Sequence, residues 1–310
     1  MKYLRLKEDD FLKLFNIQKK EFPIQCRDII RVRDFRYRKM DLARRDKIIT
    51  GILKKIDSNT LSVAGRWRQS QWECGWSENL KEYTRTHDAY SLTPKFIRPG
   101  QPLRLNRDFI MPRSNRFEFD FVDVLRRWLF SKYFRDKDVI YEFGCGSCQH
   151  LVVLSELFPE KQIIGLDWTF AAIKIIKKLT QLNKINLRGK HFNLFKPDFS
   201  YKLSPNCAVF TVGTLEQLGR NFEPFLKYLR TNKVSVCLHL ETIKELYDNG
   251  CLLDYLALKF DNKRGYLDGF LERLRELEKN KKIQILKVQR INFGSLYHDG
   301  YSLILWRPKK

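Results

Sequence analysis

The segment from Asp138 to Thr169 constrains the fold more than any other part of the chain. It contains a short apolar run, a turn built on Gly144 and Gly146, an apolar stretch with helical spacing, and a second apolar run that stops at Asp167. A strand, a glycine turn, a helix and a second strand in this order form a parallel βαβ unit, whose ligand crevice lies at the carboxyl ends of the strands. The segment therefore predicts an α/β fold with a ligand site around the glycine turn.

The residues around this turn suit a ligand that contains a nucleoside. Glycines let the backbone approach a ligand closely, and the free N–H groups at the start of a helix suit a carboxylate or a phosphate. Asp167 stands 21 residues after Gly146, where an acid can accept hydrogen bonds from both ribose hydroxyls. A dinucleotide would need a glycine at the position of Gln149, and the Glu142 carboxylate would repel its pyrophosphate. The same carboxylate would attract the cationic amino and sulfonium groups of S-adenosylmethionine, so this cofactor is favoured over NAD.

The sequence E-F-G-C-G at 142–146, followed by G-L-D at 165–167, resembles motifs I and II of the class I S-adenosylmethionine-dependent methyltransferases. The resemblance covers roughly residues 136–308, and it departs from the family at Cys148, where many members carry glycine or threonine. It implies a seven-stranded sheet, mostly parallel with an antiparallel last strand, that has helices on both faces. The cofactor-binding residues that it implies are Glu142, Phe143, Gly144, Cys145, Gly146, Asp167, Trp168, Asn193, Leu194, Gly213 and Thr214.

Two of these residues concern the adenine ring. In the resemblance, Trp168 lies on the adenine face, although a buried core tryptophan is an equal interpretation. Asn193 occupies the position whose side chain contacts the adenine amino group, and an asparagine can form hydrogen bonds with that edge.

The later segments continue the pattern, with strands expected at Leu187–Leu194, Cys207–Val212, Val234–Leu240, Ile283–Ile291 and Tyr301–Trp306.

The candidate catalytic residues come from the ends of the predicted strands. Methyl transfer from a sulfonium is an in-line displacement, in which the protein mainly aligns the nucleophile and excludes water. A hydroxyl acceptor also gains from a general base, and the candidates are Glu216, His239 and Glu241, each of which also has a structural interpretation. His87 and His298 are weaker candidates. The D/N-P-P-Y motif for amino groups of bases and the proline-cysteine pair for C5 of pyrimidines are absent from the sequence.

Residues 1–115 are expected to form an N-terminal, mainly helical and loop-rich substrate-recognition region, and residues 116–310 the methyltransferase domain. Aromatic residues and prolines within 61–115 indicate a long loop. Trp72, Trp76 and Tyr90 in this segment are candidate substrate-binding residues, with packing at the domain interface as the alternative.

Composition narrows the compartment and the partners. The net charge is +23, and residues 31–55 hold ten basic and three acidic residues, which indicates either an anionic partner or solvated helix faces. The seven irregularly spaced cysteines do not suit a disulfide framework, and no segment looks like a signal peptide or a membrane span. We therefore expect a cytoplasmic protein. Cys145 and Cys148 lack the further ligands that a zinc site needs, so we expect no metal.

These observations favour a methyltransferase that acts on a hydroxyl or an amine of a small or saccharide-like acceptor, anionic acceptors included. An RNA or DNA methyltransferase is the first alternative, because of the basic segment at 31–55. A non-catalytic binding protein that keeps the methyltransferase fold is the second, because no catalytic base is defined. The oligomeric state and the acceptor atom stay open at this stage.

Overall fold

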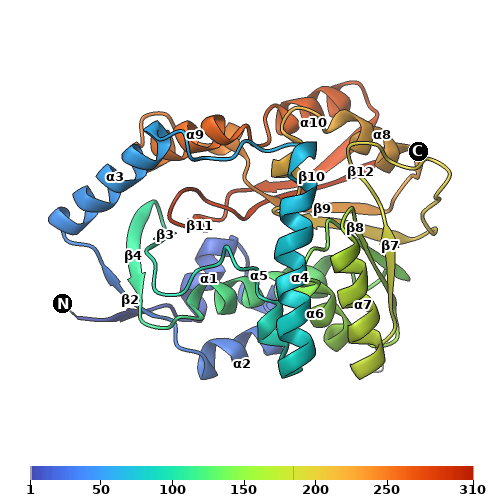
Figure 1. Cartoon of the computed structure of the whole chain (residues 1–310), viewed down its shortest axis with the longest axis horizontal. Helices are drawn as coiled ribbons and strands as arrows, with labels where there is room; N and C mark the ends of the chain where they lie inside the picture. Colours follow the sequence, from blue (N-terminus) through green and yellow to red (C-terminus); the bar gives the residue numbers. More distant parts are fainter. Residues whose placement is uncertain (1, 184, 310) are drawn as a thin grey trace.

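The computed structural model describes residues 2–183 and 185–309, and its largest element is a seven-stranded sheet (Figure 1). The strand order is β10-β12-β9-β8-β5-β6-β7. All neighbouring strands are parallel except β12, which runs antiparallel to both β9 and β10. The strands are β5 (Val139–Phe143), β6 (Gln162–Asp167), β7 (Leu187–His191), β8 (Cys207–Val212), β9 (Val236–Glu241), β10 (Ile283–Gln289) and β12 (Ser302–Pro308). This arrangement confirms the predicted fold class.

Helices cover both faces of this sheet because its central strands are apolar on both sides. In β5, Ile140 faces one core and Tyr141 and Phe143 face the other, as the alternation of side chains along a strand requires. One core is closed by α5 (Phe117–Tyr133), α6 (Gln149–Leu157) and α7 (Phe170–Asn183), and the other by α8 (Glu223–Thr231) and α10 (Phe270–Lys279). The carboxyl ends of the parallel strands are left open for a ligand.

The N-terminal region contains the expected helices together with strands that the sequence did not predict. Its helices are α1 (Glu8–Phe15), α2 (Ile24–Val32), α3 (Leu42–Asp57) and α4 (Gln69–Thr86). A second sheet has the order β1-β2-β4-β3-β11. Its strands are β1 (Leu4–Arg5), β2 (Arg36–Lys39), β3 (Leu103–Leu105), β4 (Asp108–Pro112) and β11 (Phe293–Gly294). The remaining elements are α9 (Leu252–Arg264) and the 3-10 turns η1 (Lys19–Glu21), η2 (Arg66–Arg68), η3 (Ala89–Leu92), η4 (Leu215–Leu218) and η5 (Lys244–Leu246).

The prediction of a long loop across 61–115 was wrong for its first half. The 18-residue helix α4 spans Gln69 to Thr86, and it packs beside α7 (Figure 1). Trp76 and Tyr83 are buried along α4, because residues three, four and seven apart lie on one face of a helix. The prolines of this segment all follow the helix, so they do not interrupt it.

Residues 1–115 share a hydrophobic core with the rest of the chain. Phe15 stacks on Trp128, with ring centroids 4.9 Å apart, and Phe121 stacks on Phe293 at 3.7 Å. Strand β11, far along the chain, completes the N-terminal sheet by pairing with β3. A domain boundary near residue 115 stays a prediction. Within the described residues, no helix combines the length and the apolar character that crossing a membrane requires.

Candidate functional site

The glycine turn between β5 and α6 borders a cavity of about 500 Å³ at the carboxyl ends of the strands. Gly144 and Gly146 have φ angles of 73° and 49°, which residues with a Cβ rarely adopt. A Cβ atom at Gly144 would collide with the Thr214 side chain, and one at Gly146 would lie 2.7 Å from Cζ2 of Trp76. Both glycines are therefore required by the conformation of the turn and by the close approach of its neighbours.

Glu142, the last residue but one of β5, is a buried acid at this cavity. Its side chain is 1% exposed, and its Oε2 atom has no hydrogen-bond partner among the described residues. Burial raises the pKa of Glu142 well above its usual range, and the nearby Asp167 carboxylate raises this pKa further. A buried acceptor without a partner is costly, so this position suits a ligand that brings a cationic donor.

Asp167 ends β6 and connects the glycine turn with the next loop. Its Oδ2 accepts a hydrogen bond from the Gly146 N–H at 2.9 Å. Its Oδ1 accepts two, from the N–H and the hydroxyl of Thr169, at 2.8 Å and 2.7 Å. Burial raises the pKa of Asp167, and these hydrogen bonds oppose that effect. Because Oδ1 is already saturated, Oδ2 is the oxygen that keeps an acceptor site for a ligand.

The predicted adenine end of the site is only partly as expected. Trp168, Leu194 and Phe195 line the cavity, and the rings of Trp168 and Phe195 lie 5.6 Å apart. Asn193 does not line the cavity, because its Oδ1 accepts a hydrogen bond from the Phe195 N–H at 2.9 Å and begins a local turn. Phe143 is also absent from the cavity lining, and its ring packs in the core against Phe192 and Phe225.

Two of the three candidate catalytic residues do not reach the cavity. His239 is fully buried between β8 and β12, where it bonds to the Thr211 hydroxyl at 2.9 Å and accepts from Trp306 Nε1 at 3.0 Å. Glu241 is also fully buried, and it accepts hydrogen bonds from the backbone N–H groups of Thr214 and Leu215. Both side chains serve the framework. Glu241 holds the loop that carries Gly213 and Thr214, and that loop does line the cavity.

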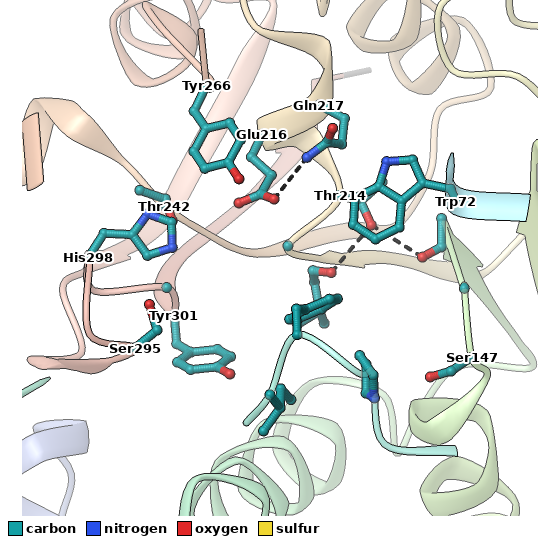
Figure 2. A pocket seen from close by; sticks show the side chains of 18 of the residues that line it. Trp72, Ser147, Thr214, Glu216, Gln217, Thr242, Tyr266, Ser295, His298 and Tyr301 are labelled. Atoms are coloured by element: carbon teal, nitrogen blue, oxygen red, sulfur yellow. Dashed lines mark hydrogen bonds between the residues drawn. The ribbon is translucent and has the colours of Figure 1, made fainter. Parts of the chain in front are cut away.

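Glu216, the third candidate, lies at the other end of the cavity in a cluster of polar side chains (Figure 2). Gln217 donates a hydrogen bond to its carboxylate at 3.0 Å. Burial raises the pKa of Glu216, and the charge of His298 acts in the opposite direction. Tyr266, Ser295 and Tyr301 surround the same space. This group of residues forms the acceptor end of the site, opposite the glycine turn.

Glu118 and Tyr301 belong to the acceptor end, and the sequence analysis missed both. The Tyr301 hydroxyl donates to Glu118 Oε1 at 3.2 Å, while Glu118 Oε2 has no partner among residues 2–183 and 185–309. Burial raises the pKa of Glu118 to about 7. A usable signal was present in the sequence, because an acid at 118 lies on the same helical face as Phe121 and Val122.

The predicted substrate-binding aromatics divide into two groups. Trp72 and Trp76 stack with ring centroids 5.3 Å apart, Phe96 packs edge-on against both, and all three line the cavity. Tyr90 does not line it, because its ring packs against Phe119 and beneath the Arg116 guanidinium. Trp76 packs against the glycine turn at Gly146, Trp72 stacks on Trp76, and the two rings form a wall of the cavity.

Helix α4 is attached to the methyltransferase sheet by polar contacts as well as by these tryptophans. The Glu73 carboxylate accepts hydrogen bonds from the N–H groups of Phe170 and Ala171 at 2.7 Å and 2.9 Å, which caps the start of α7. Gln69 donates to the carbonyl oxygen of Trp168 at 2.7 Å. The N-terminal region therefore supports the loop that follows Asp167.

The Cys145 and Cys148 thiols lie 4.0 Å apart beneath the glycine turn. Burial raises the pKa of both thiols. Within the part of the chain that the structure describes, no three residues of the types that bind metals gather into a site.

The strand order, the glycine turn after β5 and the acid at the end of β6 together define the class I methyltransferase fold. No protein-family model matches the chain, and neither does any curated protein sequence. Among solved structures, the [4+2]-cyclase SpnF has a TM-score of 0.52 and 14% identity, over 80% of this chain and 97% of the cyclase. At that identity the likeness concerns the fold alone.

Two methyltransferase structures match with lower scores. A SAM-dependent methyltransferase from Aquifex aeolicus has a TM-score of 0.39 and 18% identity, over 58% of this chain and 89% of its own. The geranyl diphosphate C-methyltransferase from Streptomyces coelicolor A3(2) was solved with S-adenosyl-L-homocysteine. It has a TM-score of 0.43 and 10% identity, and the match covers 64% of this chain and 86% of the methyltransferase.

Proposed function

We propose that the protein is an S-adenosylmethionine-dependent methyltransferase that acts on a hydroxyl or an amine of a small, saccharide-like and anionic acceptor. The observation that carries the cofactor assignment is the Glu142 carboxyl, which lines the cavity, is 1% exposed, and has in Oε2 a buried acceptor without a partner among the described residues. Such an oxygen would be satisfied by a cationic donor, and the ammonium group of the cofactor is one. A pyrophosphate at the same place would be repelled.

The residues around the cavity fit this cofactor along its whole length. Glu142 would bind the amino group, Oδ2 of Asp167 a ribose hydroxyl, and Trp168 with Leu194 the adenine ring. When bound, the cofactor supplies a methyl group on a sulfonium, which is a good leaving group. The contribution of the protein is to orient the acceptor and to exclude water, and Trp72 and Trp76 supply the apolar wall for this.

Basic side chains on the cavity lining support an anionic acceptor. Lys55, Arg68, Arg98 and Arg264 all contribute to the lining, and the volume of about 500 Å³ is within the range of small-molecule sites. Arg68 is 7% exposed and donates to Gln217 at 2.8 Å, so it also positions the loop that holds Glu216.

Methylation of RNA or DNA is a second candidate function. Helix α3 carries Arg44 and Lys47 on its exposed surface, and Lys55 of the same helix reaches the cavity. A nucleic-acid substrate predicts affinity that falls steeply as salt concentration rises, because phosphate contacts release counterions. Absence of salt-dependent binding to RNA and DNA would remove this candidate.

Titration calorimetry with S-adenosylhomocysteine, with NAD as the control, tests the cofactor assignment. We expect micromolar binding of the former alone, and at least tenfold weaker binding after Glu142→Gln, equivalent to about 1.4 kcal/mol. Binding of NAD, or of neither compound, would contradict the proposal. Because a [4+2]-cyclase shares the fold, transfer of a tritiated methyl group must also be measured, since tight binding with no transfer would favour the non-catalytic alternative.

A further inference from the structure

His298 lies at the acceptor end of the cavity and is held there by a buried acid. Its Nδ1 atom is 2.7 Å from Oδ1 of Asp261 in helix α9. Asp261 is 0% exposed, and the ring of His298 is enclosed by Phe260 and Tyr266, each with its centroid 5.8 Å away. The histidine itself lines the cavity. Its position and orientation are therefore set by the fold.

The contact with Asp261 determines which ring nitrogen is free. The Asp261 carboxylate can only accept, so Nδ1 of His298 carries the proton and donates it. In the neutral ring the lone pair then lies on Nε2. No hydrogen bond from the described residues engages Nε2, and Figure 2 shows the ring directed toward the space shared with Glu216 and Tyr301. The free base is thus presented to the cavity.

The surrounding charges favour a proton on this ring. Burial lowers the pKa of His298, but the Asp261 and Glu216 carboxylates raise it by more, so that the net pKa lies above the usual value. The positive charge of Arg104 in β3 opposes this rise, and Glu118 of α5 also interacts with the imidazole. An imidazolium that forms here is therefore stabilised where it forms.

We propose that His298 is the general base of this site, oriented by Asp261, and that it accepts the proton of a hydroxyl group on the acceptor. The inference rests on the proposed function and deepens it, because it selects alcohols among the possible acceptors. In the reaction, the acceptor oxygen bonds to the methyl carbon while the carbon–sulfur bond breaks and its electron pair stays on sulfur. The hydroxyl proton moves to Nε2 of His298 and later to solvent.

A hydroxyl suits the acceptor end better than an amine or a carboxylate. An alcohol is a weak nucleophile until a base takes its proton, whereas a neutral amine or a carboxylate attacks without that help. Glu118 and Glu216 both line the cavity, and their carboxyl groups are the hydrogen-bond partners there for further hydroxyls. These groups together suit a polyol. The basic residues of the cavity lining would bind the anionic part of that polyol.

The first test concerns the tautomer and needs no acceptor. Nitrogen-15 NMR of the full chain with bound S-adenosylhomocysteine, assigned with His298→Gln, should show a neutral ring that carries its proton on Nδ1. Asp261→Asn should lower the pKa of this histidine and weaken that preference. A neutral ring that carries the proton on Nε2 would overturn the proposal, because no lone pair would then face the cavity.

The second test uses S-adenosylmethionine with a tritiated methyl group and three acceptor panels: sugar phosphates, primary amines and carboxylic acids. We expect labelled product from the hydroxyl panel, with a rate that rises with pH through the pKa of His298. His298→Ala should lower the rate at least 100-fold, and added imidazole should restore part of it. Label on amines or carboxylates alone, or on no hydroxyl compound, would overturn the assignment.

Two controls separate this inference from the cofactor proposal. His87 is exposed and does not line the cavity, so His87→Asn should leave the transfer rate unchanged. The His298→Ala variant should bind S-adenosylhomocysteine with the wild-type affinity. If the wild-type protein does not bind S-adenosylhomocysteine, the proposed function is refuted. If His298→Ala binds it normally and transfers methyl groups at the wild-type rate, only the role of His298 is refuted.

Discussion

Trp76 lies over Gly146 so closely that a Cβ atom on the glycine would be 2.7 Å from Cζ2 of the indole ring. Gly146 also has a φ of 49°. Gly146→Ala should therefore displace Trp76 or the turn, and we expect at least tenfold weaker binding of S-adenosylhomocysteine, or about 1.4 kcal/mol, by calorimetry. Gly51→Ala is the matched control, because a Cβ at Gly51 in α3 meets nothing within 4 Å. It should stabilise the protein by about 0.5–1 kcal/mol and leave binding unchanged.

Cofactor binding should release protons from Glu142. The pKa of this buried carboxyl is raised in the structure as it stands, and an ammonium group placed beside it would lower that pKa. Calorimetry of S-adenosylhomocysteine binding near pH 7, in buffers of different ionisation enthalpy, should therefore detect release of up to about one proton. Glu142→Gln should abolish most of this release, and an unchanged value in the variant would show that the proton comes from another group.

Glu118 should make the protein less stable as pH rises. Burial raises the pKa of Glu118 to about 7 in the folded chain, from the ordinary value of 4.5 for a glutamate. A group with a raised pKa contributes stability that is complete below pH 4.5 and is lost as the pH rises through 7. Denaturant unfolding at pH 5 and pH 8 should show a larger loss for the wild type than for Glu118→Gln. Equal losses would mean that Glu118 does not titrate in this range.

The buried ion pairs of Arg290 should stabilise the loop that carries His298. Arg290 donates to Asp254 at 2.5 Å and to Asp299 at 2.6 Å, and all three side chains are at most 9% exposed. Arg290→Met leaves two buried carboxylates without their cationic partner, so we expect a loss of about 3–5 kcal/mol in urea unfolding. Arg273→Met, which breaks the half-exposed pair with Glu223, should cost about 0–1 kcal/mol. Similar losses in the two variants would contradict this account.

The sequence was informative where a short segment forms its own part of the site. Glu142, Gly144, Gly146 and Asp167 all belong to one βαβ unit, so their spacing alone predicted that they meet at one edge of the sheet. The antiparallel last strand was predicted only by the family resemblance. The strand predicted at Cys207–Val212 coincides with β8.

The acceptor end could not be predicted, because its residues meet only in the tertiary structure. His298 and Asp261 are 37 residues apart, and Glu118 and Tyr301 are 183 residues apart. His239 and Glu241 looked accessible because they end a strand, but β9 lies between β8 and β12, which bury both side chains. The local sequence does not reveal which strands will lie on either side of a given strand. It therefore could not distinguish the buried His239 and Glu241 from His298, which lines the cavity.

The cap that Glu73 places on α7 limits how the polypeptide can be divided. The two N–H groups that Glu73 satisfies belong to α7, which packs on the methyltransferase sheet. Phe15 of α1 likewise covers a residue beyond position 115, because its ring stacks on Trp128 of α5. A gene fragment that encodes residues 116–310 alone would leave these groups exposed. Fusion, truncation or shuffling of this protein should therefore keep α1 and α4 together with the helices that they contact.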